Sequence, residues 1–203
     1  MKNQESGRSM IEMLGVLAII GVLSVGGLSV YSQAMHRYKV AQVSSQVVDT
    51  IEHVKKLYSG EHIYAHLLDY VRNNAMSVTA FDVEGNTLKH AMGGTALVRQ
   101  CSRRANDTNE AFCIAIKGLQ KKECVDLLTQ RWGGGIFAVG AVRGPEACYE
   151  ESGILDTSEN AKRTSPVHDG DALIAYKGAM PVSPVDAVQV CSETGNLLFF
   201  KIR

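Results

Sequence analysis

The chain opens with a long apolar stretch. Eighteen consecutive uncharged residues run from Met13 to Val30, and Met10 and Ile11 extend the apolar character toward the N-terminus. As an α-helix these eighteen residues are about 27 Å long. A bilayer has a hydrocarbon core about 30 Å thick, so this stretch is predicted to span a membrane. One carboxylate, Glu12, stands at the start of the run, and ionisable residues in such positions usually mark function.

The helical pattern continues beyond the apolar run. Residues from Tyr31 to Tyr58 include no proline and no glycine, and their apolar positions form a one-sided stripe. Lys55 and Lys56 suit the negative end of a helix dipole, and Gly60 offers a stop signal. The pattern predicts one helix of about 50 residues from Ser9, much longer than the average helix of a globular protein. Its second half is expected to pack on a sheet.

The remainder of the chain predicts a mixed helix and strand domain of ordinary size, since roughly 145 residues follow the long helix. Helices are predicted at Glu61–Met76 and Leu119–Arg131, and strands at Ser77–Asp82, Thr95–Cys101, Ala111–Lys117, Ile136–Val142, Ala172–Tyr176 and Asn196–Ile202. The stretch from Gly144 to Pro184 has the least regular pattern and holds all four prolines. Only Ala172–Tyr176 is predicted as a strand within it.

The residues around Glu12 resemble the class III signal of bacterial type IV prepilins and type II secretion pseudopilins. The resemblance rests on Gly7, followed by Arg8-Ser9-Met10-Ile11-Glu12 and the apolar run to Tyr31. In that family a peptidase cuts after the glycine and methylates the new N-terminus, and a glutamate stands fifth in the mature chain. The resemblance implies cleavage between Gly7 and Arg8, with Glu12 as the fifth mature residue. The usual first mature residue is Phe, Met or Leu, and this chain has Arg8.

Glycines interrupt the apolar run at Gly15, Gly21, Gly26 and Gly27. Small residues allow close approach between helices in lipid, and each glycine weakens a helix by up to about 1 kcal/mol relative to alanine. Many relatives carry a proline in the second half of this helix, whereas this chain has none there. Gly21, Gly26 and Gly27 are therefore predicted to give the helix its flexibility, with the Gly26-Gly27 pair as its weakest point.

Two features further along resemble the type IVb pilins of plasmid thin pili. Gly93-Gly94 follows an Asn-containing turn and precedes a predicted strand. A cysteine on a helix after the early strands, Cys124, matches the one that bonds in that class to a cysteine before the last strand, here Cys191. The resemblance thus implies a Cys124–Cys191 disulfide. It also implies that the region from Gly144 to Pro184 is a disulfide-bounded surface that varies among pilins.

Five cysteines follow the apolar run, and none forms a C-x-x-C pair. This usage fits an oxidising compartment, two disulfides and one remaining cysteine. Cys101 and Cys113 lie on adjacent strands of a predicted hairpin, which favours them as the second pair and leaves Cys148 over. Sequence alone does not decide cysteine pairings.

Composition narrows the function class. Twenty-one basic and 21 acidic residues leave no net charge, so no direct nucleic-acid binding through a basic face is expected. Gly133-Gly134-Gly135 lacks the Gly-Lys-Ser/Thr of a phosphate loop, and Asp169-Gly170-Asp171 lacks the later ligands of a calcium loop. The six histidines show no metal-ligand spacing. No catalytic residue, metal site or cofactor is predicted, and the protein is not expected to be an enzyme.

The resemblance implies an α+β pilin fold, with a long N-terminal helix packed on an antiparallel sheet. It divides the chain into a leader (1–7), a transmembrane and polymerisation helix (8–31), the amphipathic second half of that helix (32–58) and a globular head (59–203). The implied partners are other copies of the chain, the prepilin peptidase, the assembly machinery of the inner membrane, and host or bacterial cell surfaces. The implied route leads from the inner membrane, with the head in the periplasm, to an extracellular pilus.

Other interpretations stay open. A type II secretion pseudopilin and a minor or tip pilin share the same architecture. A membrane-anchored periplasmic binding domain that never polymerises belongs to a different class, and it explains neither Gly7 nor Glu12. A secretory signal peptide cut after Ser32-Gln33-Ala34 is disfavoured because the apolar run exceeds the usual length of its apolar core.

Overall fold

Helix α1 runs from Glu5 to Leu57 in the computed structural model. The structure describes residues 5–61, 63–85, 87–101, 109–133, 135–143, 164–169 and 172–203. The chain divides into two compact units, Met1–Lys39 and Val40–Arg203. The first contains the N-terminal part of α1, and the second is called the head below. Lys55 and Lys56 occupy the last turn of α1, and Gly60 follows with a φ of 96°, as the stop signal predicts.

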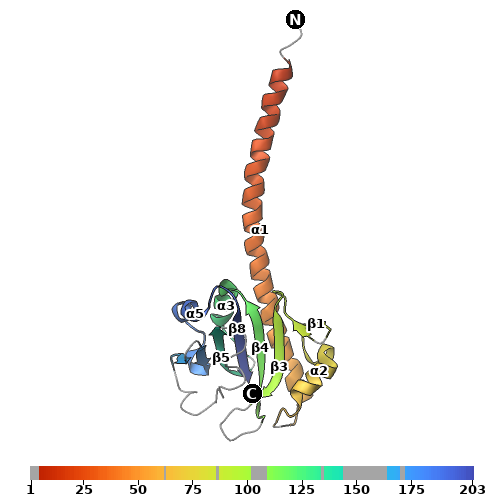
Figure 1. Ribbon diagram of the computed structural model, residues 1–203, viewed down its shortest axis with the longest axis vertical. Coiled ribbons are helices and arrows are strands. Elements are labelled where there is room, and N and C mark those ends of the chain that lie inside the picture. Colours follow the sequence, from red (N-terminus) through yellow and green to blue (C-terminus); the bar gives the residue numbers. More distant parts are fainter. Residues whose placement is uncertain are drawn as a thin grey trace. The chain divides into compact units, whose positions relative to one another are not determined.

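The described part of the head contains an eight-stranded antiparallel sheet in the order β1-β2-β3-β4-β8-β5-β7-β6 (Figure 1). Its strands are β1 (Asp82–Glu84), β2 (Thr87–Lys89), β3 (Thr95–Cys101), β4 (Ala111–Leu119), β5 (Ile136–Arg143), β6 (Val167–Asp169), β7 (Ala172–Tyr176) and β8 (Asn196–Ile202). The helical elements of the head besides the end of α1 are α2 (Leu67–Val78), α3 (Lys121–Leu128), the 3₁₀ turn η1 (Lys177–Ala179) and α5 (Pro184–Val190).

The last strand lies inside the sheet, between β4 and β5. All seven residues of β8 are buried, and so are the first six of β4. Strands with both faces buried have continuous apolar sequences rather than alternating ones, as residues 197–200 of β8 have. Closing the head therefore requires the C-terminal strand to reach a central position.

One face of the sheet packs on α1 (Figure 1). Val43, Val47, Ile51 and Val54 are at most 2% exposed and lie in one core with Phe200 and other residues of the central strands. Their spacing of four, four and three residues puts them on one side of the helix. Full burial of such side chains contributes about 1.5–3 kcal/mol each. This confirms the prediction that the second half of the long helix packs on a sheet.

Three predicted strands have the same bounds in the structure, namely Thr95–Cys101, Ala172–Tyr176 and Asn196–Ile202. Two more are longer by one or two residues at their C-terminal ends, and β4 continues to Leu119 through an irregularity beside Gly118, whose φ is 86°. Helix α3 begins at Lys121 and not at Leu119, because the Gln120–Glu123 capping box defines its N-terminus.

The predicted strand Ser77–Asp82 is wrong. Helix α2 continues to Val78, and the next residues do not pair in the sheet. The backbone N–H of Ala80 donates instead to Thr50 Oγ1 of α1 at 3.0 Å. The donor that a strand would use is thus occupied by a helix side chain. The actual strands are the unpredicted hairpin β1–β2, which turns at Gly85 with a φ of 61°.

Helix α2 begins at Leu67, later than the predicted Glu61. His66 immediately before it has a φ of 58°, which a right-handed helix excludes. Tyr64 packs on Phe112 with ring centroids 4.8 Å apart, and the hydroxyl of Tyr58 donates to the carbonyl of Ala65 at 2.7 Å. Tertiary contacts therefore hold this segment outside the helix despite its apolar spacing.

The region predicted to be least regular contains more structure than expected. Strand β6 pairs with β7, and α5 begins at the end of this region. Ser183 caps α5 by accepting from the N–H of Asp186 at 3.2 Å, and Pro184 occupies the first turn. Such a Ser-Pro start is a recognised helix signal. Cys148 and most of the Gly144–Pro184 stretch lie outside the described residues.

Both predicted disulfides are present, Cys124–Cys191 and Cys101–Cys113. Their Cα atoms are 6.0 Å and 6.2 Å apart, within the range that disulfides adopt. Cys101–Cys113 joins β3 to β4, and Cys124–Cys191 joins α3 to the end of α5. Beside the second bridge, Asn196 donates to the carbonyls of Leu119 and Ser192 at 3.0 Å and 2.8 Å, which ties the start of β8 to the end of β4.

Gly94 is required by close packing between β2 and β4. A Cβ atom there would overlap the carbonyl oxygen of Lys117 and the ring of His90. His90 is 2% exposed, and its Nε2 lies 3.0 Å from that carbonyl oxygen. Its Nδ1 accepts from the N–H of Met92 at 3.3 Å. The imidazole is therefore held as the neutral tautomer that donates from Nε2.

The long-range disulfide is expected to stabilise the head more than the hairpin disulfide. Cys124–Cys191 closes a loop of 67 residues and Cys101–Cys113 one of 12. In the chain-entropy model these loops correspond to roughly 4 and 3 kcal/mol. The variant with Cys124→Ala and Cys191→Ala should thus unfold at lower denaturant than the variant with Cys101→Ala and Cys113→Ala. Urea titration of the full chain in detergent measures both, and the reverse order would contradict the prediction.

Stability of the head is expected to fall with acidification through His90. Burial lowers the pKa of His90 below its ordinary value of 6.5, outweighing the opposing effect of the hydrogen bond to Lys117. At pH values between the folded and the unfolded pKa of His90, the unfolded state binds more protons than the folded state. The contribution of neutral His90 to the free energy of unfolding is therefore complete above about pH 6.5 and is lost as the pH falls toward the folded pKa. His90→Gln should flatten the pH dependence of urea unfolding. His53→Gln, at an exposed histidine, should leave the pH dependence of urea unfolding as in the parent. The same pH dependence in the parent and in both variants would refute the role of His90.

Candidate functional site

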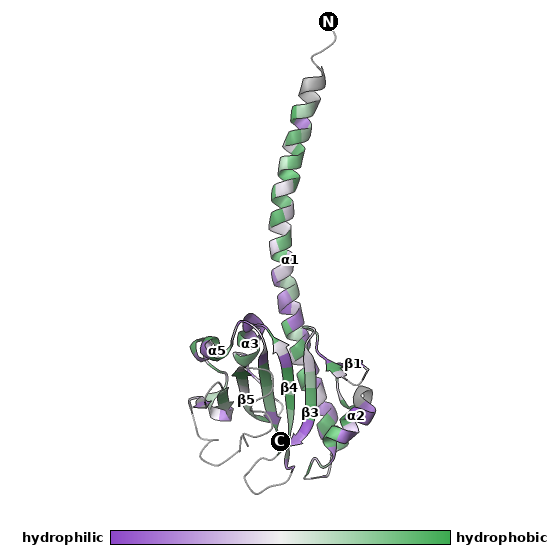
Figure 2. Cartoon of the chain, viewed as in Figure 1, coloured by the Kyte–Doolittle hydropathy of each residue, from purple (hydrophilic) through white to green (hydrophobic). Residues whose placement is uncertain are grey.

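The N-terminal part of α1 presents a large apolar surface. The large apolar side chains from Met10 to Val30 are each between 53% and 75% exposed, and Figure 2 shows the corresponding ribbon mostly in green. Exposed apolar surface of this extent marks a membrane or protein contact. By length and composition, α1 from Met10 is the one helix in the described residues that is suited to cross a membrane. None of its most apolar window is buried within the chain.

Glu12 is exposed and lies on α1 between the apolar residues Ile11 and Met13. Gly7 and Arg8 also belong to α1, which begins at Glu5, but the side chain of Arg8 is outside the described part of the structure. Arg8 and Glu12 are four residues apart, which puts them on the same side of the helix, one turn from each other. The backbone therefore brings together the two residues predicted to act in assembly.

The glycines of this helix are not needed for packing inside the chain. A Cβ atom at Gly15, Gly21, Gly26 or Gly27 would meet nothing within 4 Å. Ser24 nearby donates its hydroxyl to the carbonyl of Ile20 at 2.7 Å, which satisfies that polar group inside the helix. No packing contact within the described part of the chain therefore requires glycine at these positions.

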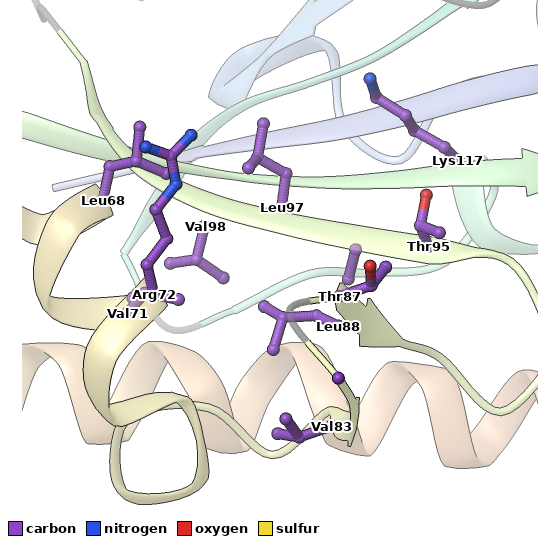
Figure 3. Close-up of a pocket in the computed structure, with 12 residues that line it drawn as sticks. Leu68, Val71, Arg72, Val83, Thr87, Leu88, Thr95, Leu97, Val98 and Lys117 are labelled. Carbon is purple, nitrogen blue, oxygen red and sulfur yellow. The ribbon is translucent and has the colours of Figure 1, made fainter.

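The head has a cavity of about 310 Å³ between α2, the β1–β2 hairpin and β3 (Figure 3). Its apolar lining includes Leu68, Leu88 and Leu97, while Arg72 and Lys117 stand at different ends of it (Figure 3). The Arg72 guanidinium lies 4.0 Å from the carboxylate of Asp69, and both are exposed.

A second cavity of about 520 Å³ lies between the turn that follows α3 and the segment that follows β7. It contains Trp132, which the prediction of function did not use. The sequence offered a signal for this cavity, since Trp132 is the sole tryptophan of the chain and directly follows the basic residue Arg131.

Metal and catalytic chemistry find little support in the described residues. They contain no group of three His, Cys, Asp or Glu side chains close enough to hold a metal ion. Burial is the largest cause of the raised pKa of Tyr58 and Tyr64 and of the lowered pKa of Lys55. All three side chains are partly buried, and burial disfavours the charged form of each group. Gly134 of the Gly133-Gly134-Gly135 run and the last two residues of Asp169-Gly170-Asp171 lie outside the described residues.

Comparison with known proteins gives a consistent result. A family model described as PilS N terminal matches residues 37–162, more than half of the chain. The major structural subunits of bundle-forming pilus from Escherichia coli O111:H- and from Escherichia coli O127:H6 are both 23% identical over 178 residues. Each alignment covers 87% of this chain and 90% of the relative.

Among solved structures, TcpA, a type IV pilin from Vibrio cholerae El Tor biotype, aligns with a TM-score of 0.50 and 14% identity. The alignment covers 82% of this chain and 99% of that one. At this identity the likeness concerns the fold alone, and it confirms the predicted pilin fold. With the match over residues 37–162, the chain belongs to the PilS N terminal family and is a pilin.

Proposed function

We propose that this chain is the structural subunit of a type IVb pilus and polymerises through α1. The observation that carries the proposal is the exposed, uncharged surface from Met13 to Val30, next to a single exposed carboxylate at Glu12. Such a surface needs lipid or other protein around it. The curated relatives are major structural subunits of bundle-forming pilus, which supports a structural role and not a catalytic one.

In this proposal the same surface serves in two environments. Before assembly, the helix lies in the inner membrane and holds the head in the periplasm. After assembly, helices of many copies bury one another and the heads form the outer surface of an extracellular filament. The transfer keeps apolar side chains out of water at each stage, which is why one sequence suits both. Gly21, Gly26 and Gly27 would let the helix bend and let neighbouring helices approach closely.

The precursor is proposed to be cut between Gly7 and Arg8 by the prepilin peptidase. Cleavage creates a free amine at Arg8, four residues before Glu12. The guanidinium of Arg8 adds a second positive group at that place, which is a feature of this chain.

The first test is the intact mass of the protein from its native membrane, with and without the peptidase gene. We expect a chain that begins at Arg8 when the peptidase is present, and an uncut chain when it is absent. One further methyl group would show that Arg8 is accepted for methylation. An uncut chain in both strains would indicate a plain membrane anchor, and a chain that begins at Met35 a secreted soluble domain. Either result would refute the proposal.

Glu12 is proposed to pair with the amine of Arg8 on a neighbouring copy. Helices packed in a filament exclude water, so each charged group there needs a partner. Removing one partner of a buried ion pair costs about 3–5 kcal/mol. The pair would therefore set the axial register between neighbouring helices, because other registers leave a charge unpaired.

The pairing is tested with Glu12→Gln and Glu12→Ala. We expect normally processed subunits and filament yields reduced roughly tenfold or more, because a penalty of several kcal/mol applies at each contact. Glu52→Gln removes an exposed carboxylate from the same helix within the head and should assemble like the parent. Sheared filaments and membrane-retained subunits are measured by immunoblot. Parental filament yields from both Glu12 variants would disprove the pairing.

A further inference from the structure

The second cavity of the head, here called the Trp132 cavity, combines an aromatic wall with two cations. It is lined by Arg131, Trp132, Gly133, Gly135, Ile136, Lys177, Met180 and Pro181. Its volume of about 520 Å³ lies in the range of small-ligand sites. All of these residues belong to the head.

The fold holds Trp132 in one orientation. Its indole Nε1 donates to the carbonyl of Leu127 at 2.9 Å, and its ring meets Phe200 edge to face with centroids 4.6 Å apart. The side chain nevertheless stays partly exposed. A ring fixed by the protein and open to the cavity offers a rigid stacking surface, which costs little conformational entropy on binding.

The backbone around the ring is also held in place. The N–H of Arg203 at the end of β8 donates to the carbonyl of Gly135 at 3.2 Å. Gly135 has a φ of 85°, and a side chain there would overlap Lys55 Nζ. The cavity wall that leads into β5 is therefore shaped by the same strand that completes the sheet.

Two cations, Arg131 and Lys177, line this cavity, and Lys55 Nζ and the main-chain oxygen of Arg203 lie beside its wall at Gly135. Arg131 and Lys177 are both exposed, and the lining residues include no carboxylate. Within the part of the chain that the structure describes, neither side chain forms an ion pair. The whole chain has no net charge, so the positive charge is a local property of this cavity and favours an anionic ligand.

We propose that the Trp132 cavity binds an acidic saccharide, with the C–H face of one sugar ring stacked on the indole and its carboxylate or sulfate held by Arg131 and Lys177. The apolar side chains of Met180 and Pro181 complete the wall for the rest of the sugar. A nucleic acid needs a row of cations along its backbone, whereas here two cations line one cavity. The site concerns the head alone, so it stands independently of cleavage and polymerisation.

The binding test uses Trp132 as its own reporter, because it is the sole tryptophan of the chain. The full chain, in a neutral detergent without a sugar headgroup, is titrated with 3′-sialyllactose while tryptophan fluorescence is recorded. We expect a saturable change, and lactose, which lacks the carboxylate, should bind at least about tenfold more weakly. Equal responses to the two sugars, or none to either sialyllactose or a sulfated disaccharide, would overturn the proposal.

Variants then assign the contacts. Arg131→Gln and Lys177→Gln should each weaken sialyllactose binding about tenfold or more. The matched control is Lys122→Gln, which removes an exposed cation from α3 beside a different cavity and should bind like the parent. Trp132→Phe removes the fluorescent reporter, so the affinity of this variant for sialyllactose is measured by calorimetry. The variant should bind more weakly, because the phenyl ring offers a smaller stacking surface while it still contacts Phe200. Unchanged affinity for sialyllactose in all three cavity variants would reject a saccharide site. Inorganic phosphate or an oligoglutamate peptide that competes as strongly as sialyllactose binds would reject it as well.

Discussion

The head depends on burial of one side of α1 against the central strands of its sheet. Val43, Val47, Ile51 and Val54 supply that side, and they are almost completely buried. The same helix is exposed and apolar on all sides before Val30. A one-sided stripe is satisfied by the chain's own sheet, whereas an all-round apolar surface is not. This difference within one helix separates the part that stabilises the fold from the part available for other molecules.

The head is closed by its C-terminal strand. Because β8 lies between β4 and β5, residues far apart in sequence must meet before the sheet is complete. Cys191 and Asn196 reinforce that closure, through a disulfide to α3 and hydrogen bonds at the end of β4. Phe200 of β8 also supports the ring of Trp132. The strand that completes the core thus also shapes one of the cavities on the surface.

The described residues include groups that the fold itself occupies and groups that face outward. Buried titratable groups such as His90 are held by hydrogen bonds inside the core, and four cysteines are paired with one another. The groups left for other molecules are an apolar helix with one carboxylate, and cavities rimmed by cations. Structural subunits need such surfaces, because their neighbours replace the solvent that the isolated chain would meet.

The local pattern of apolar and polar residues was sufficient to predict an element wherever burial of its side chains was the dominant interaction. The apolar run, the valine stripe and the four consecutive apolar residues 197–200 each predict their own element, because burial follows directly from side-chain type. The two disulfides followed from resemblance and from a hairpin. Pattern failed where a distant residue took over a local group, as Thr50 does for the N–H of Ala80 and the packing of Tyr64 does before α2. The long helix and its two kinds of surface follow from side-chain type along the chain, and the class of the protein follows from the resemblance around Gly7 and Glu12. The place where Trp132, Arg131 and Lys177 meet depends on the fold, because the turn after α3 and the segment after β7 are far apart in sequence and come together only when the sheet forms.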